Sequence, residues 1–272
     1  MITQHIDRII TRRDFRTVDS LAVTSIFETI QGEGPYAGRP CLFLRMAGCN
    51  FGDKSADRSC AFCDTSFELA KAKHYTVAEL VRELTGRLKA SNLDLIVITG
   101  GEPTLQANLA KVIAAIKLPI VVQFETNGTQ GYFPKLLDDT RSDDELEIAY
   151  VVSPKANGKA GRYPKIASEY LDNTSNAVLK FVVTADVESP HHTVPDWALA
   201  CAVPIIYVSP MAVYLRSYEG EVSNAWDHTL VDPVATSKNY AYAAQYVMEL
   251  SKAHSHTSFR LSLQTHLFTN IP

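Results

Sequence analysis

Three cysteines that lie close together are the residues of this sequence with the most evident chemistry. Cys60 and Cys63 are separated by two residues, and Cys49 precedes them across the polar loop Asn50–Ser59. Thiolates at this spacing suit a soft metal centre, and three ligands are one fewer than an electron-transfer iron–sulfur cluster uses. One iron of a four-iron cluster would stay open to a further ligand. The spacing therefore predicts a reactive cluster site rather than a simple electron carrier.

The same three cysteines leave two other interpretations open. A structural zinc ion would need a fourth ligand, for which His74 or Cys41 can be considered, although neither has a regular zinc-finger spacing. Cys60 and Cys63 alone would form a redox-active Cys-x-x-Cys motif. The remaining cysteines, Cys41 and Cys201, are predicted to be buried, because free cysteine is among the most buried residue types.

The composition is that of an ordinary globular protein. Of the 272 residues, 46% are hydrophobic and 21% are charged, and the net charge of -4 gives no reason to expect nucleic acid or an anionic membrane as the partner. A small-molecule substrate is favoured. The sequence shows neither the apolar core of a secretory signal nor a stretch long enough to cross a bilayer. We therefore expect a soluble, cytoplasmic protein with one domain spanning residues 1–272.

Short β-rich apolar runs recur along the chain, most of them about one βα unit apart. They are Cys41–Met46, Leu93–Thr99, Ile120–Glu125, Ile148–Ser153, Ala177–Val183, Ile205–Ser209 and Phe259–Leu263. Near-continuous hydrophobicity is typical of parallel strands, whose crossover segments are usually helical. Helices are predicted to begin at Thr76, where Thr76 and Glu79 form a capping-box pattern, to follow Pro103, and to cover Tyr240–Leu250. This order predicts an α/β fold, a partial or modified (β/α) barrel.

Polar segments directly follow four of these runs. They are Thr99–Pro103, Glu125–Gly128, Ser153–Lys155 and Ser209–Met211. Because reactive groups of a parallel barrel gather at the carboxyl ends of its strands, we expect these segments to share one site. Insertions are predicted near residues 50–59, 157–163 and 211–237.

Three motifs follow one another along the chain. Cys49…Cys60-x-x-Cys63 is followed by Thr99-Gly100-Gly101-Glu102-Pro103 and then by Glu125-Thr126-Asn127-Gly128. This order resembles the radical S-adenosylmethionine (SAM) superfamily, and the resemblance implies a 4Fe–4S cluster on the three cysteines with SAM on the open iron. It also implies cofactor contacts from Phe62, Asp64, Gly100, Gly101, Glu102, Thr126, Asn127, Ser153, Pro154, Lys155, Ser209 and Met211. Taken alone, the glycine pair would indicate only a strand-to-helix turn.

Two further segments lie at the start of this series of motifs, one before Cys49 and one that contains it. They read Phe27-Glu28-Thr29-Ile30-Gln31-Gly32-Glu33-Gly34 and Leu44-Arg45-Met46-Ala47-Gly48-Cys49-Asn50. With the other motifs they resemble the 7-carboxy-7-deazaguanine synthase family, from about Thr24 to the end of the chain. The resemblance implies Mg²⁺ at Thr65, catalytic roles for Arg45, Thr65 and His266, and contacts to a pterin substrate from Ile30, Gln31, Gly32, Glu33, Arg45, Thr99 and Pro272.

Several of these residues have a purely structural alternative. Arg45 could form an internal salt bridge, and Gln31–Gly34 could be only a turn. His266 could pack beneath the barrel, and Pro272 could belong to a frayed terminus. The sequence also departs from the family pattern, since ten residues instead of three separate Cys49 from Cys60, and Ser209 stands where glutamine is expected.

The resemblance implies a radical ring contraction of 6-carboxy-5,6,7,8-tetrahydropterin to 7-carboxy-7-deazaguanine, with loss of ammonia. It further implies a homodimer and an external electron donor such as flavodoxin. Two other functions stay open at this point. One is an activase that generates a glycyl radical on a protein partner, and the other is a zinc-stabilised binding module without catalysis.

Overall fold

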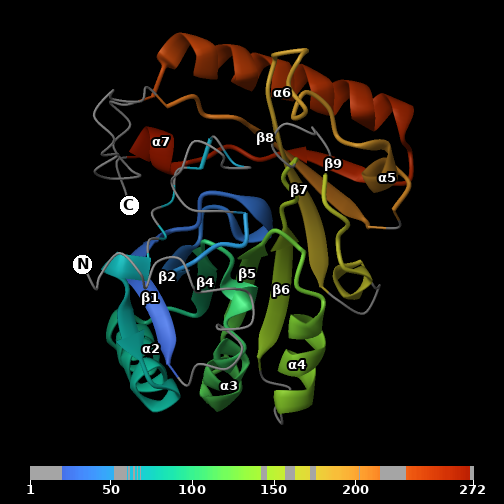
Figure 1. The fold of residues 1–272 in the computed structure, drawn as a ribbon. Coiled ribbons are helices and arrows are strands. Elements are labelled where there is room, and N and C mark those ends of the chain that lie inside the picture. Colours follow the sequence, from blue (N-terminus) through green and yellow to red (C-terminus); the bar gives the residue numbers. More distant parts are fainter. Residues whose placement is uncertain are drawn as a thin grey trace, which may run out of the picture.

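One nine-stranded sheet organises the chain in the computed structural model (Figure 1). The structure describes residues 20–51, 60, 62, 63, 65, 67, 69–141, 146–156, 163–171, 176–201, 203–214 and 231–269. The strands are β1 Leu21–Ile30, β2 Pro40–Met46, β3 Lys73–Tyr75, β4 Leu95–Gly100, β5 Val121–Thr126, β6 Glu147–Val152, β7 Ala177–Val183, β8 Ile205–Pro210 and β9 Ser258–Leu261. The α-helices are α2 Val77–Ser91, α3 Asn108–Ala115, α4 Tyr132–Thr140, α5 Asp196–Leu199, α6 Pro233–Ala253 and α7 His266–Thr269.

The sheet is an open, mainly parallel arrangement. Its strand order is β3-β1-β2-β4-β5-β6-β7-β8-β9, and every neighbouring pair from β2 to β9 is parallel. Within the described residues no pairing joins the edge strands β3 and β9, so the barrel does not close. The predicted α/β partial barrel is therefore confirmed, and each predicted apolar run overlaps a strand.

Two strands at one edge, β1 and β3, were not predicted. Both are antiparallel to their neighbours, and β1 carries a bulge between Val23 and Ser25. Antiparallel strands with one solvent-exposed face alternate polar and apolar residues, whereas the prediction relied on continuous apolar runs. The Thr24 hydroxyl, at the bulge, donates a hydrogen bond of 3.0 Å to the backbone oxygen of Arg45. This pairing fixes β1 beside the strand that leads to Cys49.

The main core lies between the sheet and its helices. Alternate strand residues such as Leu44, Ile98 and Phe181 are fully buried there, together with the leucines of α2 and the apolar face of α3. Figure 1 shows α2, α3, α4 and α6 along the outer side of the curved sheet. In the part of the chain that the structure describes, the opposite face holds two small apolar clusters, around Val97 and around Val151. Since successive strand residues point to opposite faces, every second residue is directed into the concave side.

Three helix predictions can be compared with the structure. The capping box before α2 is present, with Glu79 N donating to Thr76 Oγ1 at 3.2 Å and Thr76 N donating to Glu79 Oε2 at 2.8 Å. Pro103 starts only a 3-10 turn, η4, and α3 begins at Asn108. The α6 helix begins at Pro233 rather than Tyr240, because the Asp232 carboxylate accepts from two backbone N–H groups of its first turn.

Two further sequence predictions concern membrane spans and insertions. Every helix within the described part of the chain is too short or too polar to cross a bilayer. The central parts of the predicted insertions, residues 52–59, 157–162 and 215–230, lie outside the described residues.

Candidate active site

A pocket opens on the concave face of the sheet at the carboxyl ends of the strands. Arg45, Thr99 and Glu125 line it from β2, β4 and β5, and Lys180 and Ser209 line it from β7 and β8. Arg45 and Thr99 lie directly opposite each other in the β2–β4 register. The strand alternation that sends their neighbours into the core sends these polar side chains into the pocket. The predicted gathering of strand ends at one site is confirmed.

The three cysteines of the motif all line this pocket. Cys49 follows β2, while Cys60 and Cys63 are joined by a turn in which Cys63 N donates to Cys60 O at 3.0 Å. Burial raises the pKa of the Cys49 thiol to about 12, so in the metal-free protein this sulfur is protonated. Metal binding at Cys49 must therefore release a proton.

The glycine pair at the end of β4 holds the segment that carries Cys49. Gly101 N donates to Met46 O at 3.1 Å, and Glu102 N donates to Gly48 O at 2.8 Å. A Cβ atom on Gly101 would lie 1.9 Å from Gly48 O, and Gly100 has a φ of +119°. Glycine is thus required because two backbone segments approach more closely than any side chain allows. Both glycines also border the pocket.

Glu102 was predicted to contact the cofactor, but its side chain points away from the pocket into the protein. Its side chain is buried, and it is not among the residues that line the pocket. The carboxylate accepts hydrogen bonds from Thr104 Oγ1 at 2.5 Å, Thr126 Oγ1 at 2.7 Å and Asn127 N at 2.7 Å. Burial raises the pKa of Glu102, and these hydrogen bonds oppose that rise. Glu102 therefore joins the β4 and β5 strand ends from inside the protein.

Asn127 extends this connection to the cysteine loop. Its Nδ2 donates to Asn50 Oδ1 at 2.8 Å, and Asn50 Nδ2 donates to Thr129 Oγ1 at 2.9 Å. Asn50 directly follows Cys49, so the β5 strand end helps to fix the first cysteine. Thr126 and Asn127 both line the pocket, as their predicted cofactor roles require.

Lys155 stands on the pocket wall next to the cysteine pair. Its Nζ donates to the backbone oxygen of Ser153 at 2.7 Å and also to the Ser153 hydroxyl. Burial lowers the pKa of Lys155 and the charge of Lys180 acts in the same direction, whereas negative charge on Cys60, Glu33 and Cys63 opposes this effect. A cation beside two sulfurs is suited to balance the negative charge that they carry as metal ligands. Ser153 and Lys155 line the pocket, whereas the neighbouring Pro154 does not.

Phe62, between the two cysteines, packs against His191. Their rings meet edge to face with centroids 5.0 Å apart, and the Tyr163 hydroxyl lies 3.4 Å from His191 Nδ1. Burial lowers the pKa of His191 to about 4, and the positive charge of Lys155 acts in the same direction. His191 is thus a neutral side chain against which the cysteine turn rests.

A group of charged and amide side chains forms another part of the pocket wall. Lys180 Nζ donates to Glu33 Oε2 at 2.7 Å and lies 4.0 Å from Glu125 Oε2. Gln31 Nε2 donates to Glu125 Oε1 at 3.0 Å. Gln31, Gly32 and Glu33 were predicted as substrate contacts and all line the pocket. The loop after β1 is therefore both a turn and a pocket wall.

Sequence reasoning missed Lys180 and did not assign Glu125, although Glu125 begins a motif that it singled out. Lys180 is the one charged residue in the apolar β7 sequence AVLKFVV. A lysine in an otherwise buried strand is a signal that could have identified it, since lysine is almost never fully buried without a partner.

The remaining predicted site residues fall into three groups. Phe62, Thr65, Thr99, Ser209 and Ile30 line the pocket, whereas Met211 does not. Asp64, Pro272 and the side chain of His266 lie outside the described residues.

The alternative zinc ligands lie away from this pocket. His74 on β3 is within 3.3 Å of the Ser20 hydroxyl, and the Cys41 thiol is buried and donates to Thr29 O at 3.6 Å. Neither lines the pocket with the three motif cysteines. Cys41 is fully buried as predicted, whereas Cys201, which was also predicted to be buried, is only half-buried.

Comparison with known proteins identifies the class of enzyme that has this fold and site. The model of the radical SAM superfamily matches residues 44–147, which include the three cysteines and the glycine pair. The solved structure of QueE from Escherichia coli has the same fold, with a TM-score of 0.52 over 94% of this chain and 99% of that chain at 21% identity. The protein is a radical SAM enzyme.

Two relatives narrow the class to a family. A 7-carboxy-7-deazaguanine synthase from Rickettsia prowazekii is 32% identical over 254 residues, covering 92% of this chain and 88% of the relative. Another from Hyperthermus butylicus is 34% identical over 201 residues, covering 70% of this chain and 77% of the relative. The chain belongs to the 7-carboxy-7-deazaguanine synthase family.

Membership of the radical SAM superfamily implies a 4Fe–4S cluster and SAM, and the residues of the pocket fit these groups. Three thiols and a lysine ammonium face one space, and the glycine pair keeps side chains out of the adjoining wall. Among the described residues, no three His, Cys, Asp or Glu side chains are arranged closely enough to hold a single metal ion. A four-iron cluster differs from a single ion because each thiolate binds a different iron.

Proposed function

We propose that this protein converts 6-carboxy-5,6,7,8-tetrahydropterin into 7-carboxy-7-deazaguanine and ammonia, using a 4Fe–4S cluster, SAM and Mg²⁺. The observation that supports this most is that one pocket contains both the cysteines of the cluster motif and a set of polar groups suited to a pterin acid. Arg45 and Glu33 belong to this second set. The names of the relatives in the same family support the same reaction.

In this proposal Arg45 binds the substrate carboxylate. A guanidinium group presents two parallel N–H donors to a carboxylate, and Arg45 is 8% exposed, so the ion pair would form away from bulk water. The ring of Phe27, whose centroid lies 5.3 Å from the guanidinium carbon, restricts where the Arg45 side chain can point. The carboxylates of Glu33 and Glu125 would accept from N–H groups of the pterin ring.

When bound, the reduced cluster and SAM supply an adenosyl radical that removes a hydrogen atom from the substrate. The chain contributes position and shielding: Lys155 and Ser153 stand where they can meet the polar end of SAM, and Asn127 does so from the next strand. Loss of ammonia from the substrate balances the reaction without net oxidation, so SAM can be regenerated.

Thr65 is proposed to provide the single protein ligand for Mg²⁺, with substrate oxygens and water as the others. Its position on the pocket wall supports this assignment. A site with one protein ligand would bind Mg²⁺ weakly without substrate. By the same family resemblance, His266 and the carboxylate of Pro272 are proposed to contact substrate, an external reductant such as flavodoxin supplies the electron, and the protein acts as a homodimer.

The test is anaerobic reconstitution with iron and sulfide, followed by incubation with SAM, Mg²⁺, a reductant and the pterin. Mass spectrometry should detect 7-carboxy-7-deazaguanine, with turnover reduced when Mg²⁺ is withheld. A cluster that cleaves SAM without forming this product would instead favour the activase function, and a colourless protein containing zinc would favour the binding module.

Cys60→Ala tests the cluster assignment directly. Loss of one of three thiolate ligands should lower the iron content and abolish product formation, because the cluster has no other cysteine at that position. Cys201→Ala is the matched control, since Cys201 does not line the pocket, and it should retain both iron and activity. Full activity of Cys60→Ala under anaerobic conditions would contradict the assignment.

A further inference from the structure

The Lys180 ammonium is held inside the protein on the concave face of β7. Its side chain is 7% exposed, while the adjacent Leu179 and Phe181 point into the core on the other side of the strand. A buried ammonium is strongly disfavoured unless opposite charges or hydrogen bonds compensate it. Lys180 therefore needs its acidic neighbours, and they are the same carboxylates that face the pocket.

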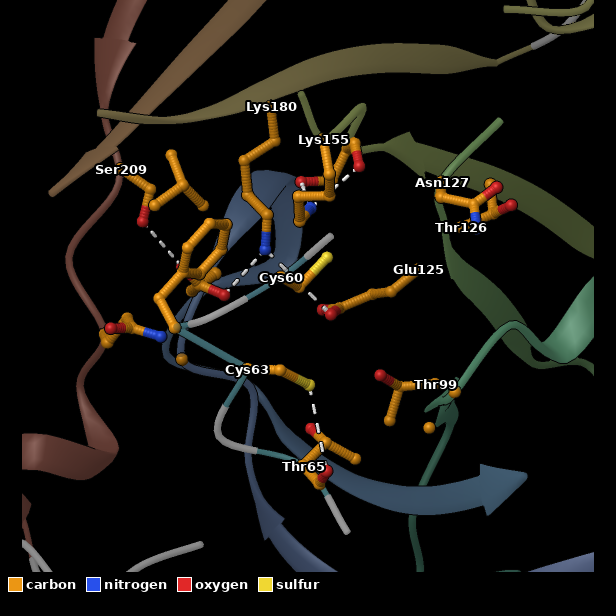
Figure 2. A pocket seen from close by; sticks show the side chains of 18 of the residues that line it. Cys60, Cys63, Thr65, Thr99, Glu125, Thr126, Asn127, Lys155, Lys180 and Ser209 are labelled. Carbon is orange, nitrogen blue, oxygen red and sulfur yellow. Dashed lines mark hydrogen bonds and ion pairs between the residues drawn. The ribbon is translucent and has the colours of Figure 1, made fainter. Parts of the chain in front are cut away.

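These neighbours come from distant parts of the sequence. Glu33 lies in the loop after β1 and Glu125 on β5, at 2.7 Å and 4.0 Å from the ammonium nitrogen. Figure 2 shows the side chains of Lys180 and Lys155 in the pocket, with Glu125 pointing towards Lys180. The three charged groups lie together only because β1, β5 and β7 share one concave face.

The second oxygen of each carboxylate is also held. Ser209 Oγ donates to Glu33 Oε1 at 2.8 Å, and Gln31 and Gln123 each donate to Glu125 Oε1, at 3.0 Å and 3.3 Å. Ser209 therefore has a definite partner at the position where the family pattern led us to expect glutamine. Each carboxylate is oriented from two sides, with Lys180 between them.

We propose that Lys180 is a positioning residue, which holds Glu33 and Glu125 in place as a pair of hydrogen-bond acceptors for the substrate. Two carboxylates facing one pocket repel each other, and the ammonium of Lys180, at 2.7 Å from Glu33 and 4.0 Å from Glu125, offsets this repulsion. With Lys180 in place both carboxylates can accept from N–H groups of a neutral heterocycle. This assignment rests on the proposed function, because it concerns how the pterin is recognised.

The test compares Lys180→Met and Lys180→Arg with the wild type in the anaerobically reconstituted full chain. Dissociation constants are measured separately for 6-carboxy-5,6,7,8-tetrahydropterin and for SAM, together with iron content, KM and kcat. Lys180→Met should weaken pterin binding by at least about tenfold and raise KM, with SAM affinity and iron content unchanged. Lys180→Arg keeps the charge and should stay within about threefold of the wild type.

Lys135→Met on α4 is the matched control, since Lys135 is an exposed lysine outside the pocket, and it should leave every value unchanged. Pterin affinity of Lys180→Met equal to that of the wild type would overturn the proposal. An equal loss in Lys180→Met and Lys180→Arg would also overturn it, because packing rather than charge would then be responsible.

Lys180→Met removes the cation between two partly buried carboxylates, so the yield of folded protein can fall. Lys180→Met combined with Glu33→Gln removes one positive and one negative charge together, and this double variant should fold and keep its iron. It should still bind the pterin weakly because a neutral amide, with one acceptor oxygen and a donor NH2 group, replaces an anionic acceptor. Wild-type affinity in the double variant would contradict the proposal. A wild-type protein without affinity for the pterin would instead contradict the proposed function itself.

Discussion

At the scale of single residues, the pocket combines buried charges with partners that determine their protonation. Lys180 lies between carboxylates, Lys155 lies beside the cysteine pair, and His191 is kept neutral beneath Phe62. Burial is the largest cause of the lowered pKa of His191, as it is for Lys155. Because His191 packs against Phe62, its protonation links the stability of the cysteine turn to pH.

Folding stability should fall as the pH decreases from about 6.5 to about 4, with His191 responsible for part of the loss. The pKa of His191 is lowered from 6.5 to about 4 in the folded protein, so the unfolded chain binds the proton first in this window. Its contribution is fully retained above pH 6.5 and is lost as the pH falls through 4, on the order of 3 kcal/mol. Urea unfolding of the metal-free protein at several pH values measures it.

His191→Phe removes the titrating group while keeping a ring against Phe62. The variant should show a shallower loss of stability between pH 6.5 and 4 than the wild type. His254→Phe is a suitable control, because His254 is also partly covered, ends α6 and lies away from the cysteine turn. Identical pH profiles for the wild type and His191→Phe would show that His191 already accepts the proton in the folded state.

At the scale of elements, the site is built by loops that are fastened to one another at the carboxyl ends of the strands. The backbone of Met46 and Gly48 accepts from Gly101 and Glu102, and the Glu102 carboxylate accepts from the β5 end. The segment that carries Cys49 is therefore positioned by β4 and β5 as well as by its own strand.

Gly101→Ala should damage this connection. A Cβ atom 1.9 Å from Gly48 O would force the two segments apart, and we expect a destabilisation of roughly 2–4 kcal/mol with reduced iron content. Thermal unfolding and iron analysis after reconstitution measure the two effects.

Gly86→Ala is the matched control for this substitution. Gly86 lies in α2, and a Cβ atom added there would meet no other atom within 4 Å, so alanine should raise stability by up to about 1 kcal/mol. If Gly101→Ala and Gly86→Ala changed stability alike, the close approach at Gly101 would not constrain the fold.

At the scale of the whole molecule, the pocket is bordered by elements from β1 to the segment after β9. Gln31 follows β1, and Gln264 follows β9, yet both line the same space. The edge strands β3 and β9 do not pair in the described residues, and Gly34 N, which donates to Ser262 Oγ at 3.3 Å, joins the loop after β1 to the segment after β9. A ligand that contacts several strands would add further connections across the open sheet.

Substrate binding should therefore stabilise the reconstituted protein as a unit. At a substrate concentration 100 times its Kd, the gain is about 2.7 kcal/mol, which corresponds to a rise in Tm of roughly 5–10 °C. Calorimetry of the SAM-bound protein over a range of pterin concentrations measures this. Tetrahydropterin without the 6-carboxylate should give a smaller rise because it lacks the group for Arg45, and equal rises for both compounds would contradict that role.

The sequence by itself determined the features that depend on local spacing. The cysteine motif, the glycine pair, the capping box of α2 and the series of apolar strands are each contained within a short segment, so their patterns predicted the site and the partial barrel. Only the tertiary structure decided what depends on register between distant strands: the convergence of Lys180, Glu33 and Glu125, the inward turn of Glu102, and the antiparallel strands β1 and β3. A side chain's neighbours across a sheet follow from how strands pair and curve, and that pairing is a property of the whole chain.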